Sequence, residues 1–325
     1  MKLEVQKISW AMREPFKISR GTLHSIDGIL VTLTDGAARG RGEAYGIMYE
    51  DETPESMQAQ IEAVRPAIEA GMDRIELLSL LPFGGARCGL DFALWDIEAK
   101  RSGVPAWRSA GLENVRPIVT AYTIGMKPVA DVRRVAEEQS SFGLLKIKVN
   151  DVDPIAVISA ARQGNPKARF IVDPNQSWSF EMLAELAPQL KSLGVVLLEQ
   201  PLRIGHDDGL SGYASPIPIC ADELIHDRND LPKAHGKYTH INIKLDKAGG
   251  LTEGLEMARL AREQGFGLMV GCMAGSSLSM APAALLGQLC DFVDLDGPLL
   301  QTHDWSPALV YRDGLLYPPA GALWG

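Results

Sequence analysis

Eight short apolar segments in the later part of the chain each end in a polar or reactive residue. These residues are Thr123, Lys148, Asp173, Glu199, Asp222, Lys244, Cys272 and Asp296. Successive members are separated by 22 to 28 residues, which suits one strand plus one helix. The even interval predicts an α/β fold, a (β/α) barrel whose strands carry the catalytic groups at their carboxyl ends. A doubly wound sheet is the alternative, disfavoured because no glycine-rich phosphate-binding turn follows an early strand.

The alternation of side chains along each strand indicates which of them point into the barrel. Side chains two apart face the same side of a strand, and three polar pairs share the inward face by this rule: Lys146 with Lys148, Asn242 with Lys244, and Asp294 with Asp296. A single such pair is usually an ordinary solvated strand end. Three lysines and five carboxylates gathered at one mouth would instead resist losing water unless paired or bound to metal. We therefore interpret the set as a functional site.

Three of these carboxylates predict a magnesium site. Asp173, Glu199 and Asp222 come from consecutive strands, and each supplies the hard oxygen ligand that Mg²⁺ prefers. Zinc is disfavoured because no histidine or cysteine accompanies them. Asn175 follows the first ligand closely and is expected to hydrogen bond near it. We expect one Mg²⁺ per subunit.

Two of the lysines are placed to act on one carbon from opposite sides. Lys148 ends the second strand and Lys244 the sixth, and strands four apart in an eight-stranded barrel are diametrically opposed. Nearby cations lower the pKa of a lysine, so a neutral amine becomes available to take a proton. Two opposed bases that flank one carbon would remove a proton from one face and return one to the other. That chemistry inverts a stereocentre.

The aspartates of the eighth strand predict a site for an ammonium group. A substrate with its carboxylate at the metal and its ammonium at Asp294 and Asp296 would span the pocket, with the acidic carbon between the lysines. The simplest such compound is a dipeptide. The alternative is that the two aspartates form a helix N-cap and a turn before Gly297 and Pro298.

The motifs then indicate a family. The segments KIK, VDPN, LEQP, ADE, NIKLDKAGG, GCM and DLDGP occur in the order found in the muconate-lactonizing subgroup of the enolase superfamily. The chain resembles the dipeptide epimerases of the L-Ala-D/L-Glu type. The resemblance implies a modified TIM barrel with an α+β capping domain, and Mg²⁺ on the three carboxylates. It also implies that Lys148 and Lys244 carry out a 1,1-proton transfer through a metal-stabilised enediolate.

The resemblance also implies a set of residues around the substrate. Lys146 would be a supporting cation near the metal-bound carboxylate, and the remaining candidates are Thr123, Cys272, Met273, Asp294 and Asp296. The first loop of the cap, REPFKISRGTLHS, would line the pocket. Within it Arg20 matches the position that meets an acidic side chain of the second residue, although it also suits a surface position before a glycine. After GCM, residues 274–277 are all small, where the family often has a larger residue, which predicts extra room in the pocket.

Two further readings of the function stay open at this point. A muconate cycloisomerase or an o-succinylbenzoate synthase would use the same enolate chemistry on a substrate without an ammonium group. A noncatalytic binding protein on an inherited barrel is the other alternative, because fold does not determine function.

The order of predicted strands and helices along the chain suggests two domains. Residues 1–115 begin with two alternating strands and continue with helices, which predicts an α+β cap, and residues 305–325 are expected to return to it. Residues 116–304 alternate short apolar runs with amphipathic helices and form the predicted barrel.

Composition excludes several classes of partner. The net charge is −9 and the sequence pI is about 5.3, without the clustered basic residues that bind nucleic acid or an anionic membrane. The amino terminus lacks the apolar run of a signal peptide, and four well-separated cysteines fit a reducing compartment, so we expect a cytoplasmic protein. The expected partner is a small-molecule dipeptide, and a homo-oligomer is compatible with the sequence.

Overall fold

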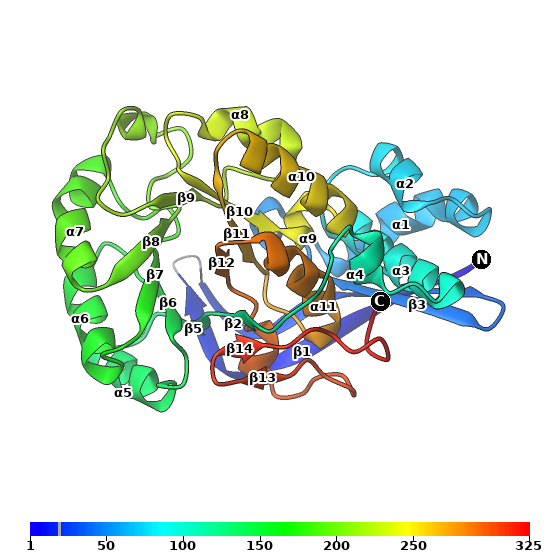
Figure 1. Ribbon diagram of the computed structural model, residues 1–325, viewed down its shortest axis with the longest axis horizontal. Coiled ribbons are helices and arrows are strands. Elements are labelled where there is room, and N and C mark those ends of the chain that lie inside the picture. Colours follow the sequence, from blue (N-terminus) through cyan, green and yellow to red (C-terminus); the bar gives the residue numbers. More distant parts are fainter. Residues whose placement is uncertain (19–20) are drawn as a thin grey trace.

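The computed structural model describes residues 1–18 and 21–325, in which a barrel of parallel strands is joined to an N-terminal cap of strands and helices (Figure 1). The cap contains one antiparallel sheet in the order β1-β2-β3. Its elements are β1 (Lys2–Ile18), β2 (Gly21–Asp35), β3 (Ala38–Ala44), η1 (Met48–Glu50), α1 (Pro54–Glu69), α2 (Arg74–Leu80), α3 (Gly85–Ser102) and α4 (Ala106–Ser109).

Local sequence explains how the cap helices form and pack. Thr53 and Ser56 make a reciprocal capping box at the start of α1, where Pro54 occupies the first helical position. Helix α3 lies directly on β3, and glycine allows the close approach. A Cβ at Gly42 would lie 2.1 Å from the carbonyl oxygen of Gly89, so a larger residue would push the helix off the sheet.

The first two strands are longer than their apolar alternation predicts. Alternation ends near Trp10, yet β1 continues to Ile18 and pairs with β2 as a long two-stranded ribbon. The register shifts between Ala11 and Phe16, where charged residues and Pro15 interrupt the period-two pattern. The segment expected to be a loop is therefore mostly a β-ribbon, and only its tip lies outside the described residues.

The barrel contains the eight expected parallel strands, in sequential order from β5 to β12. Its strands are β5 (Tyr122–Ile124), β6 (Leu144–Lys148), β7 (Arg169–Asp173), β8 (Val195–Glu199), β9 (Ile219–Ala221), β10 (His240–Lys244), β11 (Gly267–Gly271) and β12 (Phe292–Val293). The backbone N–H of Ala121 donates to the carbonyl of Val293 at 2.8 Å, which joins the first strand to the last. The prediction of a barrel is confirmed.

Helices surround this barrel (Figure 1). They are α5 (Val129–Glu138), α6 (Pro154–Gly164), α7 (Phe180–Ser192), α8 (Leu231–Ala234), α9 (Leu245–Ala248), α10 (Leu251–Glu263) and α11 (Ser277–Leu286). Short 3₁₀ turns supplement them: η2 (Asp208–Leu210), η3 (Arg228–Asp230), η4 (Gly287–Leu289) and η5 (Gly297–Leu300). Between β8 and β9 the connection has only η2 in place of an α-helix, one way in which the barrel departs from the regular pattern.

The barrel interior has an apolar floor that accounts for the position of the polar residues. The floor consists of Ala121, Leu144, Ile171, Leu197, Cys220 and Met269. Five of these lie two residues before Thr123, Lys146, Asp173, Glu199 and Asp222. Because side chains two apart share a face, the polar residues form the next layer up, toward the carboxyl ends of the strands. The inward orientation predicted from alternation is confirmed.

The C-terminal segment contacts both parts of the chain. Strand β13 (Tyr311–Arg312) pairs with β14 (Leu315–Leu316), and β14 pairs with β4 (Ile118–Val119), just before the barrel begins. Beyond them, the indole of Trp324 donates to the carbonyl of Phe92 at 3.0 Å, and the N–H of Gly325 donates to Asp96 at 2.7 Å. The chain end thus lies against α3, while the domain boundaries stay predictions. Among the described residues, no helix is long and apolar enough to span a membrane.

Candidate active site

A cavity of about 340 Å³ lies at the carboxyl ends of the barrel strands, bounded on the cap side by the ribbon β1–β2 and by η1. Ten residues predicted from sequence line it: Thr123, Lys146, Lys148, Asn175, Asp222, Lys244, Cys272, Met273, Asp294 and Asp296. Asp173 and Glu199 are fully buried in the same layer. Arg20 lies outside the described residues. Phe16, Ile18, Leu23 and Met48 supply an apolar wall from the cap.

Asp173 and Asp222 are each paired with one of the two opposed lysines. Nζ of Lys148 lies 2.6 Å from Oδ2 of Asp173, and Nζ of Lys244 lies 2.7 Å from Oδ2 of Asp222. Burial alone would raise the pKa of Asp173, but Lys148 and Lys146 outweigh it and lower this pKa to about 2. Asp222 follows the same pattern, with its pKa held well below the usual range by adjacent lysines. Both groups are therefore carboxylates.

Lys244 differs from expectation in one respect. The sequence predicts a lowered pKa for this lysine. Burial would lower the pKa of Lys244, but the Asp222 carboxylate outweighs burial and raises it. The reason is that the sequence argument counted neighbouring cations and not the anion in direct contact. In this arrangement Lys244 is an ammonium, ready to donate a proton rather than to accept one.

Glu199 has the opposite electrostatic environment from its two neighbours. Burial and the negative charge of Asp173 outweigh Lys146 and raise the pKa of Glu199 to about 8. Its Oε1 accepts a hydrogen bond from Asn242 at 3.0 Å. Negative charge is therefore in excess around Glu199, the middle one of the three carboxylates, and this excess favours binding of a cation.

The donor set fits a hard divalent ion, although the side chains are arranged around lysines. Among residues 1–18 and 21–325, no three His, Cys, Asp or Glu side chains adopt a metal-holding geometry. Lysine ammonium groups contact the oxygens of Asp173 and Asp222 instead. The chemistry of the donors is nonetheless that of an oxygen-ligand site: Asp173, Glu199 and Asp222 are buried and come from three adjacent strands.

Lys146 links the carboxylates on the two sides of the barrel. Its Nζ lies 2.7 Å from Oε2 of Glu199, 2.8 Å from Oδ2 of Asp294 and 3.3 Å from Oδ2 of Asp173. Burial opposes its charge, but the carboxylates, Asp294 foremost, outweigh burial and raise the pKa of Lys146. Lys146 is thus a permanent cation and not a candidate base.

The aspartates after β12 hold an acidic corner of the cavity. The N–H of Thr123 donates to Oδ2 of Asp296 at 2.5 Å, and its hydroxyl donates to Oδ1 of Asp294 at 3.2 Å. Burial and the charge of Asp294 raise the pKa of Asp296 to about 7. Asp296 occupies the N-cap position of η5, but its side chain makes no capping hydrogen bond. The capping interpretation therefore holds for its position and not for its carboxyl group.

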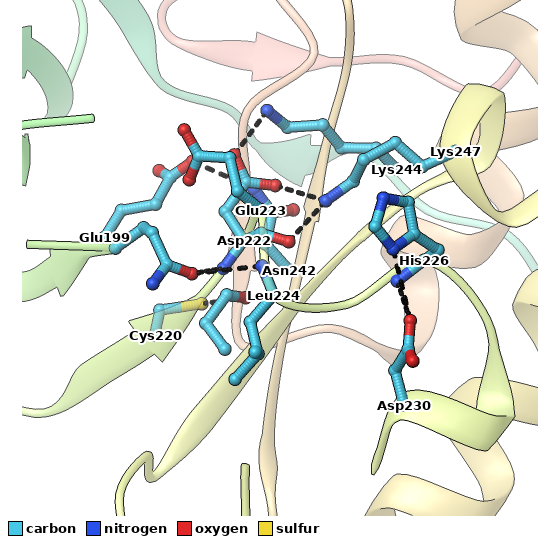
Figure 2. Close-up of polar contacts among 12 residues, drawn as sticks. Glu199, Cys220, Asp222, Glu223, Leu224, His226, Asp230, Asn242, Lys244 and Lys247 are labelled. Carbon is cyan, nitrogen blue, oxygen red and sulfur yellow. Dashed lines mark hydrogen bonds and ion pairs between the residues drawn. The ribbon is translucent and has the colours of Figure 1, made fainter. Parts of the chain in front are cut away.

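Sequence reasoning gave no role to Lys247. This fully buried lysine lies on α9, and its Nζ is 2.7 Å from Oδ1 of Asp222 and 2.5 Å from the Asp222 carbonyl oxygen (Figure 2). Asp222 thus has a lysine on each carboxylate oxygen, since Lys244 contacts the other. The available signal was its position three residues after Lys244, which places it one helical turn further along the chain.

The small residues at positions 274–277 contribute to packing between cap and barrel more than to the volume of the cavity. Gly275 has a φ of +121°, and a Cβ there would lie 2.3 Å from the ring of Tyr45. Ser276 and Ser277 are fully buried. The backbone N–H of Ser276 donates to Glu43 at 3.2 Å. Only Ala274 of this group lines the cavity, so the segment is small because the cap packs closely on it.

The architecture and the site together define a class: a modified TIM barrel with an N-terminal capping domain, whose functional groups lie between the two. The comparisons name the family. Residues 128–322 match "Enolase C-terminal domain-like", and residues 1–111 match "Mandelate racemase / muconate lactonizing enzyme, N-terminal domain". The chain belongs to this family, as its motifs predicted.

Similar proteins share most of their length with this chain. It is 38% identical to the L-Ala-D/L-Glu epimerase of Escherichia coli (strain K12), over 97% of this chain and 99% of that protein. It is 40% identical to an N-acetyl-D-glutamate racemase from a Pseudoalteromonas species, over 91% and 95%. A solved structure of an enolase family member from Agrobacterium tumefaciens, with homology to dipeptide epimerases and with sodium and L-Ala-L-Glu bound, has a TM-score of 0.97. It is 41% identical and covers 99% of each chain.

Proposed function

We propose that this protein is a Mg²⁺-dependent dipeptide epimerase, an isomerase that inverts the α-carbon of the C-terminal residue of L-Ala-D/L-Glu. One observation carries the proposal. Lys148 and Lys244 stand on strands four apart in the barrel and line the same cavity, so a substrate between them has an amine on each face. Inversion by a 1,1-proton transfer needs that arrangement.

The two lysines would exchange roles according to the epimer bound. One Nζ takes the α-proton from its face, and the opposite Nζ delivers a proton to the other face. Lys244, an ammonium in this structure because of Asp222, is the proton donor in the direction where Lys148 is the base. Nζ of Lys148 also lies 3.3 Å from Oδ1 of Asn175, which orients it.

Asp173, Glu199 and Asp222 would hold the magnesium ion. The excess negative charge at Glu199 supports this assignment, because a divalent cation would offset it. When bound, the ion supplies positive charge that stabilises the negative charge developing on the substrate carboxylate. Lys146, permanently cationic and in contact with Glu199 and Asp294, would support the same carboxylate from within the barrel.

The acidic corner suits the free amino end of a dipeptide. Asp296 has a raised pKa because it is buried beside Asp294, and an ammonium group placed there would relieve that repulsion. Thr123, Cys272 and Met273 line the same region and would contact the first residue of the substrate. The L-Ala-D/L-Glu epimerase of Escherichia coli, similar over nearly the whole chain, supports the choice of dipeptide, and recycling of cell-wall peptides in the cytoplasm is the proposed setting.

A second candidate is racemisation of an N-acylated glutamate, favoured by the 40% identity to an N-acetyl-D-glutamate racemase. Such a substrate has no ammonium group, and neither have those of a muconate cycloisomerase or an o-succinylbenzoate synthase. Asp294→Asn and Asp296→Asn should therefore leave activity on these compounds nearly intact, while activity on a dipeptide should fall.

The experiment is a substrate screen by solvent exchange. L,L-dipeptides and N-acetyl-L-glutamate are incubated with enzyme and Mg²⁺ in deuterium oxide, and mass spectrometry follows deuterium at the α-carbon. We expect exchange in dipeptides with a C-terminal acidic residue. A preference for acidic residues that survives Arg20→Ala would refute the proposed role of Arg20, and absence of exchange in every compound would refute the function.

A further inference from the structure

His226 lies where the barrel meets the cap, beside the cavity. It follows β9 and stands four residues after Asp222 (Figure 2). Its ring Nδ1 is 3.2 Å from Oδ2 of Asp230, and its backbone N–H donates to the same oxygen at 2.9 Å. Because Asp230 holds both the backbone and the ring of His226, the orientation of the imidazole is fixed from the barrel side.

The other edge of the ring contacts the cap. Nε2 of His226 lies 2.5 Å from Oε1 of Glu50, the last residue of η1. The ring also stacks on Phe83, with centroids 4.9 Å apart and planes at 26°. Two separate segments of the cap, η1 and the turn before α3, therefore meet at one barrel side chain that is only 17% exposed.

The segment held by Glu50 forms part of the cavity wall. Met48 and Tyr49, the two residues before Glu50, line the cavity. The start of the segment is fastened inside the cap, where the Glu52 carboxylate accepts the N–H of Ile47 at 2.9 Å and that of Gly85 at 3.0 Å. Within the segment, the backbone N–H of Glu50 donates to the carbonyl of Ile47 at 2.8 Å. The Glu50 side chain adds the contact that joins the segment to the barrel.

The chemistry of the contact allows His226 to hold the cap segment and the barrel together. Both ring nitrogens face carboxylate oxygens, so a protonated imidazole donates to Glu50 and Asp230 at once. Lys233, at 2.5 Å from the second oxygen of Asp230, keeps that carboxylate in place. The outer partner, Glu50, is 40% exposed at its side chain, which limits the contact to the modest strength of a partly solvated ion pair.

We propose that His226 is a positioning residue that clasps Glu50 and so holds Met48 and Tyr49 against the mouth of the barrel. The clasp acts on substrate binding and not on the proton transfer, because neither His226 nor Glu50 lines the cavity. It also joins the loop that carries Asp222 to the cap. The inference goes beyond the proposed function, since it concerns how the cap is held whatever compound the cavity accepts.

The test is a double-mutant cycle with Glu50→Met, His226→Leu and the combined variant of the full-length protein. Hydrogen exchange of the amides in residues 47–52 is measured by mass spectrometry, together with kcat and KM on the dipeptide found by the substrate screen. We expect faster exchange in both single variants and a KM raised about threefold to fivefold, the range of a partly exposed ion pair, with kcat nearly unchanged. The combined variant should be no worse than His226→Leu alone.

The control is Glu55→Met, which removes a comparable 2.8 Å ion pair with Lys7. Both partners of this pair belong to the cap, so it does not join the cap to the barrel. It should leave the exchange of residues 47–52 and KM unchanged. Unaltered exchange in Glu50→Met, additive effects in the cycle, or a loss of kcat at constant KM would each overturn the clasp. If the wild-type protein epimerises no dipeptide, the exchange data still decide the clasp, so the two proposals fail separately. Glu50→Met, a change at a partly exposed side chain, serves even if His226→Leu does not fold.

Discussion

Nζ of Lys146 lies 2.8 Å from Oδ2 of Asp294, across the interior of the barrel. The same ammonium lies 2.7 Å from Glu199, so one buried cation joins the proposed metal ligands to the acidic corner that would receive the substrate ammonium. The charge of Lys146 thus compensates carboxylates at both ends of the proposed binding site. Removing this cation should therefore affect both the metal ligands and the acidic corner.

Lys146→Met should lower the free energy of unfolding by about 3–5 kcal/mol, the usual effect of leaving buried charges unpaired. Chemical denaturation measures this loss, and Lys191→Met, at an exposed position on α7, is the control. Millimolar Mg²⁺ should recover part of the stability, because a second cation replaces the lost charge. A variant as stable as wild type without Mg²⁺ would mean that these carboxylates do not need Lys146.

Mg²⁺ should stabilise the folded protein through Asp173, Glu199 and Asp222. A ligand at one hundred times its dissociation constant adds about 2.7 kcal/mol of stability, which thermal denaturation detects. The shift should vanish in Glu199→Gln and after chelation with EDTA, and deuterium exchange should vanish with it. An equal Mg²⁺ shift in Glu199→Gln would place the ion elsewhere.

Gly275→Ala should destabilise the contact between cap and barrel. The new Cβ would lie 2.3 Å from the Tyr45 ring and 2.5 Å from Oγ of Ser279, at a φ of +121°. Steric overlap and backbone strain together should cost about 2–4 kcal/mol. Gly212→Ala is the matched control, because Gly212 also has a positive φ but open space around it. Equal losses of stability in the two variants would show that packing against Tyr45 adds nothing.

Asp246 should make stability depend on pH. It is buried near Glu52 and Glu43, which raises its pKa to about 7, while in the unfolded chain the pKa is about 4. Between these values the folded state keeps a proton that the unfolded state releases, so stability falls as pH rises from about 4 to about 7. Asp246→Asn keeps an acceptor for the Tyr45 N–H, now 2.7 Å away, and should flatten this slope. Urea denaturation at pH 5 and pH 8 measures it, and an unchanged slope would contradict the assignment.

The site was predictable where strand alternation determines orientation. Lys146, Asp173 and Glu199 each lie two residues above an apolar floor residue, and that regularity is visible in sequence. The family motifs added the expected roles of these residues to the geometry predicted from alternation. The N-cap at Thr53 is likewise a local feature, because its capping box joins residues only three apart in the chain.

Other features depend on contacts between distant parts of the chain. Lys247 reaches Asp222 from a different element, and Gly275 is required by Tyr45 of the cap, so neither contact leaves a local pattern. The long ribbon was missed because Pro15 and its charged neighbours interrupt the alternation at the bulge. The raised pKa of Lys244 depends on a 2.7 Å contact that strand order alone does not specify.

The most direct test of the proposed epimerisation follows L-Ala-L-Glu in deuterium oxide by NMR and mass spectrometry, with wild type, Lys148→Ala and Lys244→Ala in the presence of Mg²⁺. Wild type should introduce one deuterium at the α-carbon of glutamate and form L-Ala-D-Glu, and each alanine variant should lose the interconversion. Interconversion that persists in either variant would contradict a mechanism with two opposed lysines, whatever the substrate proves to be.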